Sequence, residues 1–321
     1  MKYGRIPGVD KKLSRLVQGT IMCQTDQQDF TNELLDAVFE QGINTFDTAH
    51  GYGNGECERS VGEWINSRGI RDEVVILGKG AHPNRDVPHR VTPYYISADI
   101  NDSLHRFKTD YIDLYILHRD DPSVPVGPIV ECLHEHKEKG RIHAYGGSNW
   151  SAARVAEANT YAKEHGLTPF VASSPNLSLA TQLKEPWSGC VSVSGPDGKA
   201  DREWYAQNDV TLFTWSSLAG GFFSGRFTPD NLDSFETYLD KLCVEVYCYG
   251  DNWGRLDRAN QMAEEKGVSL AQIALGYVMN QPQDIYALIA VYNANEAADS
   301  AKAIELELTV DEINWLENGA Q

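Results

Sequence analysis

Residues 44–53 read NTFDTAHGYG, and two similar stretches follow, VVILGKG at 74–80 and DLYILHRDD at 113–121. Each stretch is an apolar run that ends in polar side chains able to do chemistry. Parallel strands that are buried on both faces read as continuous runs of Val, Ile and Leu. In an eight-stranded β/α barrel, the residues at the carboxyl ends of such strands line the active site. The three stretches therefore predict neighbouring strands of one barrel.

Four residues at the ends of these strands are expected to meet. Asp47 ends the first run, and Tyr52 follows it closely. Lys79 ends the second run and His118 ends the third. The carboxyl ends of barrel strands share one face of the molecule, so these side chains should face one another there.

The same pattern recurs along the rest of the chain. Further strands are expected at five places, namely 15–24, 141–149, 169–174, 210–215 and 284–291. The polar strand ends from Asp47 to Trp215 lie 26 to 41 residues apart. That spacing fits one strand, one helix and their connections, for which about 30 residues are needed.

Helical patterns, with apolar residues at i, i+3 and i+4, alternate with these strands. They cover residues 29–42, 56–69, 92–107, 127–140, 151–166, 255–267, 269–281 and 295–306. Several end at Gly, the residue expected just after a last helical turn. The alternation predicts an α/β fold, a single (β/α)8 TIM barrel domain that spans residues 1–321.

Two stretches do not fit the alternation. Residues 182–200 are rich in Gly, Ser and Pro, and residues 226–254 mix aromatic with acidic side chains. Long βα loops are uncommon unless they are functional. We expect both stretches to be long loops that cover the site or select the substrate.

The composition limits the classes of partner. The chain has 28 Lys and Arg against 46 Asp and Glu, a formal net charge of −18, which disfavours nucleic acid and anionic membranes as partners. The amino terminus has no apolar core of a signal peptide, and no run approaches the roughly 18 apolar residues of a membrane helix. A cytoplasmic location is the expectation. The six cysteines contain no CxxC pair, so we expect reduced thiols and neither a zinc site nor a redox pair.

The four strand-end residues suit proton transfer. A tyrosine with a free pKa of about 10 is a poor acid or base near neutral pH, and each unit of depression requires about 1.4 kcal/mol of preferential stabilisation of the phenolate. Lys79, held in place by Asp47, can stabilise the phenolate of Tyr52. His118 can donate a hydrogen bond to a substrate oxygen. The set predicts a site that interconverts a carbonyl compound and its alcohol.

In these residues and their contexts the chain resembles the aldo-keto reductase family, whose Asp-Tyr-Lys-His tetrad occurs in matching positions. The similarity covers nearly the whole chain. It implies direct transfer of a hydride between a nicotinamide and the substrate carbonyl carbon, with Tyr52 as general acid or base. The resemblance implies no metal.

The resemblance also implies a cofactor-binding set. GGSNW at 146–150 resembles the segment whose Ser-Asn pair holds the nicotinamide carboxamide, and WSSLAGGFFSGRF at 215–227 resembles the loop that wraps the pyrophosphate. An aromatic residue at the position of Trp215 stacks on the nicotinamide in the family. The implied residues are Ser148, Asn149, Ser174, Trp215, Ser216, Ser217, Leu218, Gly220, Ser224, Gly225, Arg226, Asn293, Asp299 and Ser300.

The chain departs from the family's pattern at the cofactor. Ser174 stands where many members have Gln, and Trp215 stands where many have Tyr. Asp299 and Ser300 replace a Glu-Asn pair that reads the adenine.

The adenosine end also lacks the usual cation. No Arg or Lys lies between Asp284 and Lys302, although a 2′-phosphate prefers such a partner. Arg226 could serve either the pyrophosphate or the 2′-phosphate. The cofactor usual in the family favours NADP(H) as the cofactor of this chain, and NAD(H) is almost as well supported.

Five further residues are candidates for contact with the substrate, namely His50, His82, Arg119, Tyr249 and Trp253. Such a polar and aromatic mouth suits a polyhydroxylated, sugar-like carbonyl compound better than an apolar aldehyde. For Arg119 the alternative is a surface ion pair with the aspartates of HRDDP, and for the histidines it is exposure to solvent.

Other interpretations stay open at this point. Taken singly, Asp47 could be a turn residue and Tyr52 a packed aromatic, but their joint occurrence with the other two residues favours catalysis. Ser148 and Asn149 could instead cap a helix, and Trp215 could belong to the core.

Two other functions compete with the reductase. A metal-dependent hydrolase is possible on a barrel, but residues 15–24 contain no His-x-His, and Lys79 is a poor metal ligand. A regulatory subunit of the same fold could bind the cofactor with little turnover, and the intact tetrad speaks against it.

Overall fold

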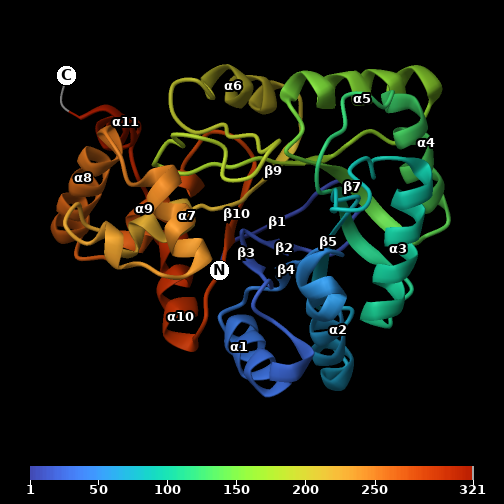
Figure 1. The fold of residues 1–321 in the computed structure, drawn as a ribbon, viewed down its shortest axis with the longest axis horizontal. Helices are drawn as coiled ribbons and strands as arrows, with labels where there is room; N and C mark the ends of the chain where they lie inside the picture. Colours follow the sequence, from blue (N-terminus) through green and yellow to red (C-terminus); the bar gives the residue numbers. More distant parts are fainter. Residues whose placement is uncertain (320–321) are drawn as a thin grey trace.

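The computed structural model describes residues 1–319 and contains a closed barrel of parallel strands (Figure 1). Around the barrel the order is β10, β3, β4, β5, β6, β7, β8 and β9. Their bounds are β3 Leu16–Gly19, β4 Thr45–Asp47, β5 Val75–Gly80, β6 Ile112–Leu117, β7 Ile142–Ser148, β8 Ala172–Ser174, β9 Thr211–Thr214 and β10 Ile285–Ile289. The prediction of a (β/α)8 barrel is confirmed.

Helices alternate with the strands and surround the barrel (Figure 1). Those predicted from the sequence are α1 Gln28–Glu40, α2 Glu56–Arg68, α3 Pro93–Phe107, α4 Val126–Glu138, α5 Ala152–His165, α8 Asp251–Lys266, α9 Leu270–Met279 and α10 Ala294–Lys302. Ser269 caps α9 as predicted, because its side chain accepts from the peptide N–H of Gln272.

Three helices were not predicted from the sequence, namely α6 Lys199–Gln207, α7 Tyr238–Tyr247 and α11 Val310–Asn318. The prediction that 226–254 is a loop throughout is therefore wrong, since α7 lies inside it. Thr237 caps α7 by accepting from the peptide N–H of Asp240, and that Thr-x-x-Asp signal was present in the sequence. Residues 182–198 do form a loop without helix or strand.

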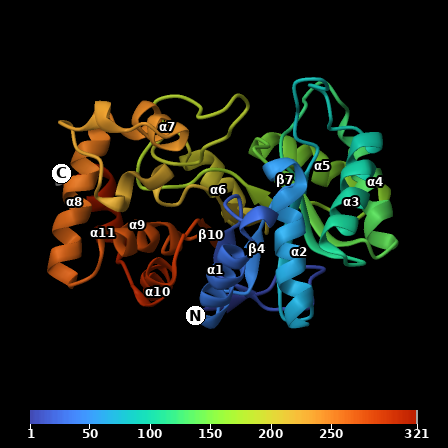
Figure 2. The same ribbon diagram turned by 60° about the horizontal axis from the view of Figure 1, so that its bottom comes forward.

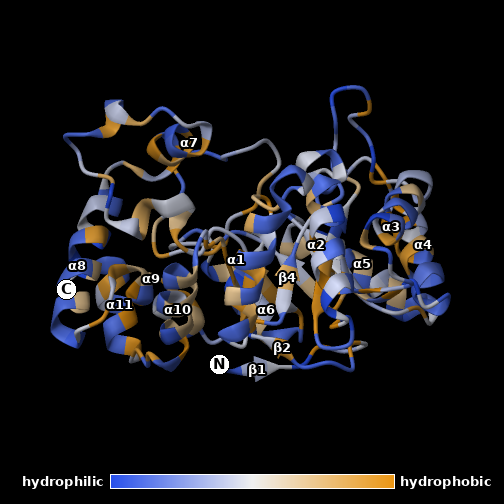
Figure 3. Cartoon of the chain, turned by 90° about the horizontal axis from the view of Figure 1, so that it is seen from below, coloured by the Kyte–Doolittle hydropathy of each residue, from blue (hydrophilic) through white to orange (hydrophobic). Residues whose placement is uncertain are grey.

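A short hairpin closes the amino end of the barrel. It pairs β1 Tyr3–Gly4 with β2 Leu13–Ser14 in antiparallel fashion. Figure 3 shows this hairpin at one end of the molecule and α7 with the long loops at the opposite end. Figure 2 places α7 above the barrel region together with those loops. The long loops and α7 therefore lie at the end of the barrel formed by the carboxyl ends of its strands.

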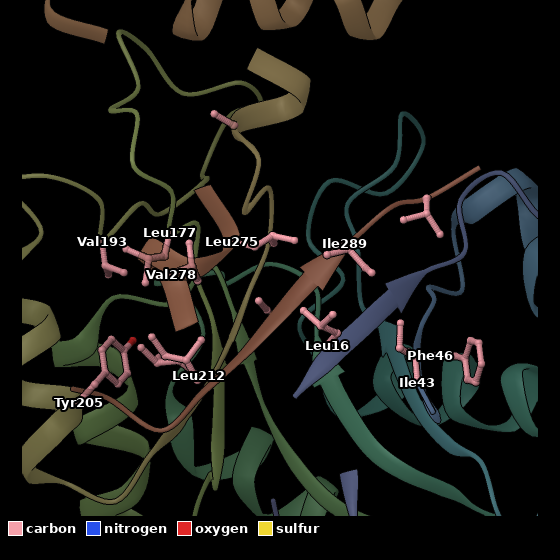
Figure 4. Close-up of a cluster of buried hydrophobic side chains, with 14 of the residues drawn as sticks. Leu16, Ile43, Phe46, Leu177, Val193, Tyr205, Leu212, Leu275, Val278 and Ile289 are labelled. Atoms are coloured by element: carbon pink, nitrogen blue, oxygen red, sulfur yellow. The ribbon is translucent and has the colours of Figure 1, made fainter. Parts of the chain in front are cut away.

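The core has two layers. Inside the barrel, Leu13 of the hairpin packs with Val17, Leu77, Ile116 and other buried strand residues. Outside it, side chains of the opposite strand faces pack against the helices, as Figure 4 shows for Leu16, Phe46, Leu212 and Ile289. Apolar side chains fill the lower interior of the barrel.

The register of the strands places the polar ends on successive levels. Asp47 pairs with Leu77, and Lys79 lies two residues further along β5. Lys79 pairs with Ile116, and His118 lies two residues beyond that. Side chains two residues apart point to the same face of a strand, so all three residues face the barrel interior near its rim.

Within residues 1–319, the helices are all too short or too polar to cross a lipid bilayer.

Replacing Gly146 by Ala should lower the free energy of unfolding by about 1–3 kcal/mol, the usual cost of overpacking. An added Cβ would lie 2.0 Å from the carbonyl oxygen of Ala172, which belongs to the paired strand β8 and cannot move aside. Gly78→Ala is the matched control, since its nearest neighbour would be a side-chain carbon of Ile112 at 3.3 Å. Urea unfolding followed by circular dichroism measures both. Equal losses in the two variants would contradict this explanation.

Candidate active site

Asp47, Lys79 and Tyr52 meet at the carboxyl end of the barrel. The ammonium of Lys79 lies 2.5 Å from Oδ1 of Asp47, and both side chains are 5% exposed. The same ammonium lies 5.2 Å from the centre of the Tyr52 ring. One buried cation thus neighbours both the carboxylate and the phenol.

The turn that carries Tyr52 is fixed by its backbone. The peptide N–H of His50 donates to the carbonyl of Lys79 at 2.7 Å, which ties the turn to β5. After Tyr52, Gly53 and Gly55 have φ of 54° and 90°, conformations that glycine adopts without steric cost. The sequence GYGNG therefore allows the chain to reverse and hold the phenol beside Lys79.

The protonation states follow from burial and charge. Burial raises the pKa of the Tyr52 phenol, and the charge of Lys79 lowers it by a smaller amount. Burial opposes the charge of Lys79, but Asp47 and the phenol outweigh this effect and raise the pKa of Lys79. The charge of Lys79 therefore offsets only part of the effect of burial on the phenol's pKa. Near neutral pH, Tyr52 is a neutral phenol beside an ammonium, a state suited to proton donation.

His118 completes the tetrad. Its ring centre lies 5.7 Å from that of Tyr52 and 4.7 Å from that of His82. Burial, followed by the charge of Lys79, holds the pKa of His118 well below its usual value, so the ring is neutral. Within residues 1–319, its buried Nδ1 has no hydrogen-bond partner. A neutral imidazole has one N–H to donate. A substrate oxygen held between the rings of His118 and Tyr52 could accept it.

Trp215 and the loop after it fit a dinucleotide. Trp215 directly follows β9, its residue is partly exposed, and its buried Nε1 finds no partner among the described residues. Ser216 and Ala219 both have φ of 53°, while Gly220 and Gly225 have φ of 63° and 80°. Consecutive peptide N–H groups in such turns form concave nests for anions. The loop could therefore hold a pyrophosphate while the indole faces a nicotinamide ring.

Ser148, Asn149 and Ser174 lie together. Oγ of Ser148 donates to the carbonyl of Ser174 at 2.9 Å and accepts from Nδ2 of Asn149 at 3.1 Å. Oδ1 of Asn149 accepts from the peptide N–H of Val191 at 3.1 Å. Ser151, not Ser148 or Asn149, caps α5. Ser148 keeps one lone pair free among the described residues, whereas Asn149 is already engaged by the loop 182–198.

The other phosphate-loop candidates differ in exposure. Ser217 and Leu218 lie at the base of the loop, where Oγ of Ser217 donates to the carbonyl of Thr214 at 3.2 Å. Ser224 is exposed.

The residues expected at the adenosine end are mostly bonded within the chain. Asn293 caps α10, and its Oδ1 accepts a peptide N–H of the first turn at 3.0 Å. Asp299 accepts from the side chains of Ser269 and Gln272, each at 2.6 Å. Ser300 is buried. Asp299 and Ser300, the pair predicted to contact the adenine, therefore have few polar groups free to bind it.

Arg226 is placed to serve this end. Its Nη2 lies 2.5 Å from Oδ1 of Asp240, and its side chain is 49% exposed. Its charge also lowers the pKa of the Tyr292 phenol, against the larger raising effect of burial. Arg226 therefore lies between the loop 216–225, which it directly follows, and the start of α10.

The candidates for substrate contact separate into three groups. His82 and Arg119 gather around His118, whereas Nε2 of His50 is 3.2 Å from an oxygen of Asp102 and 3.5 Å from one of Asp99. The contacts of the last two candidates lie among the long loops. The hydroxyl of Tyr249 bonds the side chain of Thr181 at 3.2 Å, and the ring of Trp253 packs 5.2 Å from Phe222.

Asn176 is a central residue that the sequence analysis missed. Its side chain is fully buried, and its Nδ2 donates to the carbonyl of Trp215 at 3.0 Å and to the Tyr247 hydroxyl at 3.4 Å. Its Oδ1 accepts from Ser192 at 2.7 Å and from Ser194 at 3.2 Å. One amide thus joins β9, α7 and the loop 182–198. A lone Asn between apolar residues just after a strand was the available signal.

Trp187 was also missed. Its Nε1 donates to the hydroxyl of Tyr238 at 2.8 Å, and its ring centre lies 6.4 Å from that of Trp215. It is 41% exposed. The loop 182–198 and α7 therefore touch beside the expected nicotinamide position.

No group of three or more His, Cys, Asp or Glu in the described part of the chain is arranged to hold a metal ion.

The comparisons with known proteins agree with this geometry. The model of the Aldo/keto reductase family matches residues 15–319, so the chain belongs to that family. It is an oxidoreductase that uses a nicotinamide cofactor, NADH or NADPH, to reduce small carbonyl compounds, and no comparison fixes which compound.

Relatives carry several names. Aldo-keto reductase YhdN of Bacillus subtilis is 29% identical, and the match covers 88% of this chain and 82% of that protein. Norsolorinic acid reductase B of Aspergillus parasiticus is 27% identical over 89% of this chain and 73% of its own. A rice protein (Oryza sativa), named "probable voltage-gated potassium channel subunit beta", is 25% identical over 95% and 92%. A crystal structure of the thermostable aldo-keto reductase Tm1743, with the inhibitor epalrestat, has a TM-score of 0.73 at 20% identity with full coverage of both chains, which shows the shared fold.

Replacing Asn176 by Ala should loosen the loop 182–198 and lower the free energy of unfolding by about 1–3 kcal/mol, because buried partners lose their hydrogen bonds. Hydrogen exchange should become faster at the peptide N–H groups of Val191 and Val193, which are bonded near Asn176. Asn208→Ala removes a comparable bond at an exposed helix end and should change neither quantity. Unaltered exchange in the Asn176 variant would show that the loop is held by other contacts.

Proposed function

We propose that this protein interconverts a carbonyl compound and its alcohol by direct hydride transfer, with Tyr52 as the general acid or base. The single observation that carries the proposal is the buried cluster of Asp47, Lys79 and Tyr52, with His118 beside the phenol. When bound, the nicotinamide would supply or accept the hydride.

The chain's own residues divide the remaining tasks. Tyr52 donates its phenolic proton to the substrate oxygen in reduction, and Lys79 stabilises the phenolate that remains. Asp47 holds the ammonium in place, since the two groups lie 2.5 Å apart. His118, neutral because burial lowers its pKa, orients the oxygen by a hydrogen bond. In the oxidation of an alcohol the proton moves the opposite way.

For the cofactor we propose Trp215 against the nicotinamide, Ser148 on its carboxamide and the loop 216–225 on the pyrophosphate. The positive φ values of that loop and the unpartnered Nε1 of Trp215 support this assignment. We propose NADP(H) as the preferred cofactor, with Arg226 on the 2′-phosphate. Its pairing with Asp240 would have to loosen, which keeps NAD(H) a close competitor.

We propose a polyhydroxylated, sugar-like substrate. His82 lies beside His118, and its residue is exposed overall. Partial desolvation of its ring by neighbouring groups lowers its pKa, so a neutral ring faces the mouth. Neutral imidazoles can both donate and accept hydrogen bonds, as hydroxyl groups require.

A regulatory subunit with little turnover is the second candidate. The rice relative named as a probable potassium channel subunit beta favours it. The complete tetrad favours the enzyme, because a pure cofactor sensor has no need for a buried phenol and ammonium pair.

Tyr52→Phe separates the two functions. If Tyr52 is the acid, the variant should lose turnover by about 100- to 10,000-fold, the usual contribution of general acid catalysis. Cofactor binding should stay within about threefold, because only the hydroxyl is removed. Carbonyl-dependent oxidation of NADPH measures the first quantity, and fluorescence titration measures the second. Equal activity in variant and wild type would exclude Tyr52 as the acid.

Titration with NADPH and, in parallel, with NADH should quench the tryptophan emission, because a nicotinamide would stack on Trp215. Arg226→Met should weaken NADPH binding at least tenfold and leave NADH binding nearly unchanged, since it removes the one cation proposed for the 2′-phosphate. Lys241→Met, which removes a nearby exposed cation on α7, is the control and should affect neither cofactor. Equal losses for both cofactors would instead place Arg226 on the pyrophosphate. No quenching by either cofactor would remove the basis of the proposed function.

A further inference from the structure

Arg119 is a buried arginine at the proposed proton-transfer site. It directly follows His118 after β6, and its residue is 9% exposed. Its charge acts on the pKa of Tyr52, His118 and His82, in each case as a smaller contribution than burial. Arg119 therefore stands at the same strand end as His118, and its Nη1 bonds the carbonyl of that residue.

Few of its donors are used. Within residues 1–319 its one hydrogen bond runs from Nη1 to the carbonyl of His118 at 3.1 Å. The aspartates that follow it are engaged elsewhere, Asp120 with Arg154 at 3.3 Å and Asp121 with His89 at 2.7 Å. The surface ion pair considered from the sequence is therefore wrong. A guanidinium has five N–H donors, and among the described residues only Nη1 of Arg119 has a partner.

Two other arginines nearby, both partly buried, do have carboxylate partners. Arg106 lies 2.8 Å from an oxygen of Glu58, and Arg90 bonds Asp99. Both carboxyl groups are buried. The chain thus neutralises its structural arginines in this region and leaves Arg119 without such a partner among the described residues.

The charges at the site favour an anion. Lys79 is already paired with Asp47. Burial of His118 and partial desolvation of the His82 ring lower the pKa of both side chains and keep them neutral. Arg119 is therefore the unbalanced charge of the site, within a chain whose formal net charge is −18.

We propose that Arg119 binds a carboxylate of the substrate, so that the protein acts on carbonyl compounds that carry a carboxylate, and on the corresponding hydroxy acids. The inference rests on the proposed function and specifies its substrate class. A planar guanidinium matches a carboxylate with two parallel hydrogen bonds. Sugar acids combine this group with the hydroxyls that His82 could contact.

The test compares aldehydes that differ in charge. The pairs are D-glucuronate with D-glucose and succinic semialdehyde with butanal, each assayed for kcat/KM with the preferred cofactor. Wild-type protein should favour the acid of at least one pair by tenfold or more. In Arg119→Met this ratio should fall by about 10- to 100-fold, the usual range for a charge-assisted hydrogen bond. Arg119→Lys should retain part of the preference, because it keeps the charge without the planar fork.

Two controls accompany these variants. Arg154→Met removes a neighbouring arginine that is already paired with Asp120, and it should leave the ratio at its wild-type value. Calorimetric titration with succinate, which has no carbonyl to reduce, measures anion binding independently of turnover. Wild-type protein should bind it, and Arg119→Met should bind it at least tenfold more weakly.

The outcomes separate the two proposals. If Arg119→Met lowers kcat/KM equally for acid and neutral aldehyde and shifts the pH profile, Arg119 tunes Tyr52 and the carboxylate assignment is overturned. A stronger preference for glyceraldehyde 3-phosphate over glyceraldehyde than for either acid would replace the carboxylate by a phosphate. Succinate binding that depends on Arg119, without turnover of any aldehyde, would support the anion site and overturn the proposed function. If Arg119→Met does not fold, Arg119→Lys and the wild-type ratios decide.

Discussion

The ion pair of Asp47 and Lys79 is the interaction on which the site depends. It joins adjacent strands at the rim of the barrel, where both side chains are 5% exposed. A buried pair is costly to desolvate, and removing one partner leaves an uncompensated charge. The pair therefore fixes the ammonium in one position. There its charge acts on the pKa of the Tyr52 phenol. The backbone bond from His50 to Lys79 then sets where the phenol stands.

The fold and the tetrad were predictable because they depend on local patterns. Continuous apolar runs that end in Asp47, Lys79 and His118 identified parallel strands, and the strand register explains why these three residues meet. α7 was missed because aromatic and acidic residues obscure its periodicity, although Thr237 marks its start. Asn176 and Trp187 were missed for another reason. Their roles depend on partners far away in the chain, which no local pattern encodes.

Protonation was less predictable than position. The sequence shows the cation that can stabilise the phenolate of Tyr52, whereas the burial that opposes its effect on the pKa is visible only in the structure. Likewise the HRDDP sequence suggested an arginine paired with its neighbours, whereas those aspartates turn toward Arg154 and His89. Both differences arise because desolvation and pairing depend on the packed structure. The sequence pattern predicts where these side chains lie, whereas their protonation and pairing depend on how the chain packs around them.

Asn176 has a consequence for how this enzyme can diversify. One amide bonds the backbone of Trp215, the hydroxyl of Tyr247 and two serines of the loop 182–198. The loop and α7 are consequently not independent modules. If only one of the two segments came from a homologue, some buried hydrogen bonds of Asn176 would lose their partners. Selection and laboratory recombination alike should therefore favour crossovers that transfer the loop and α7 together.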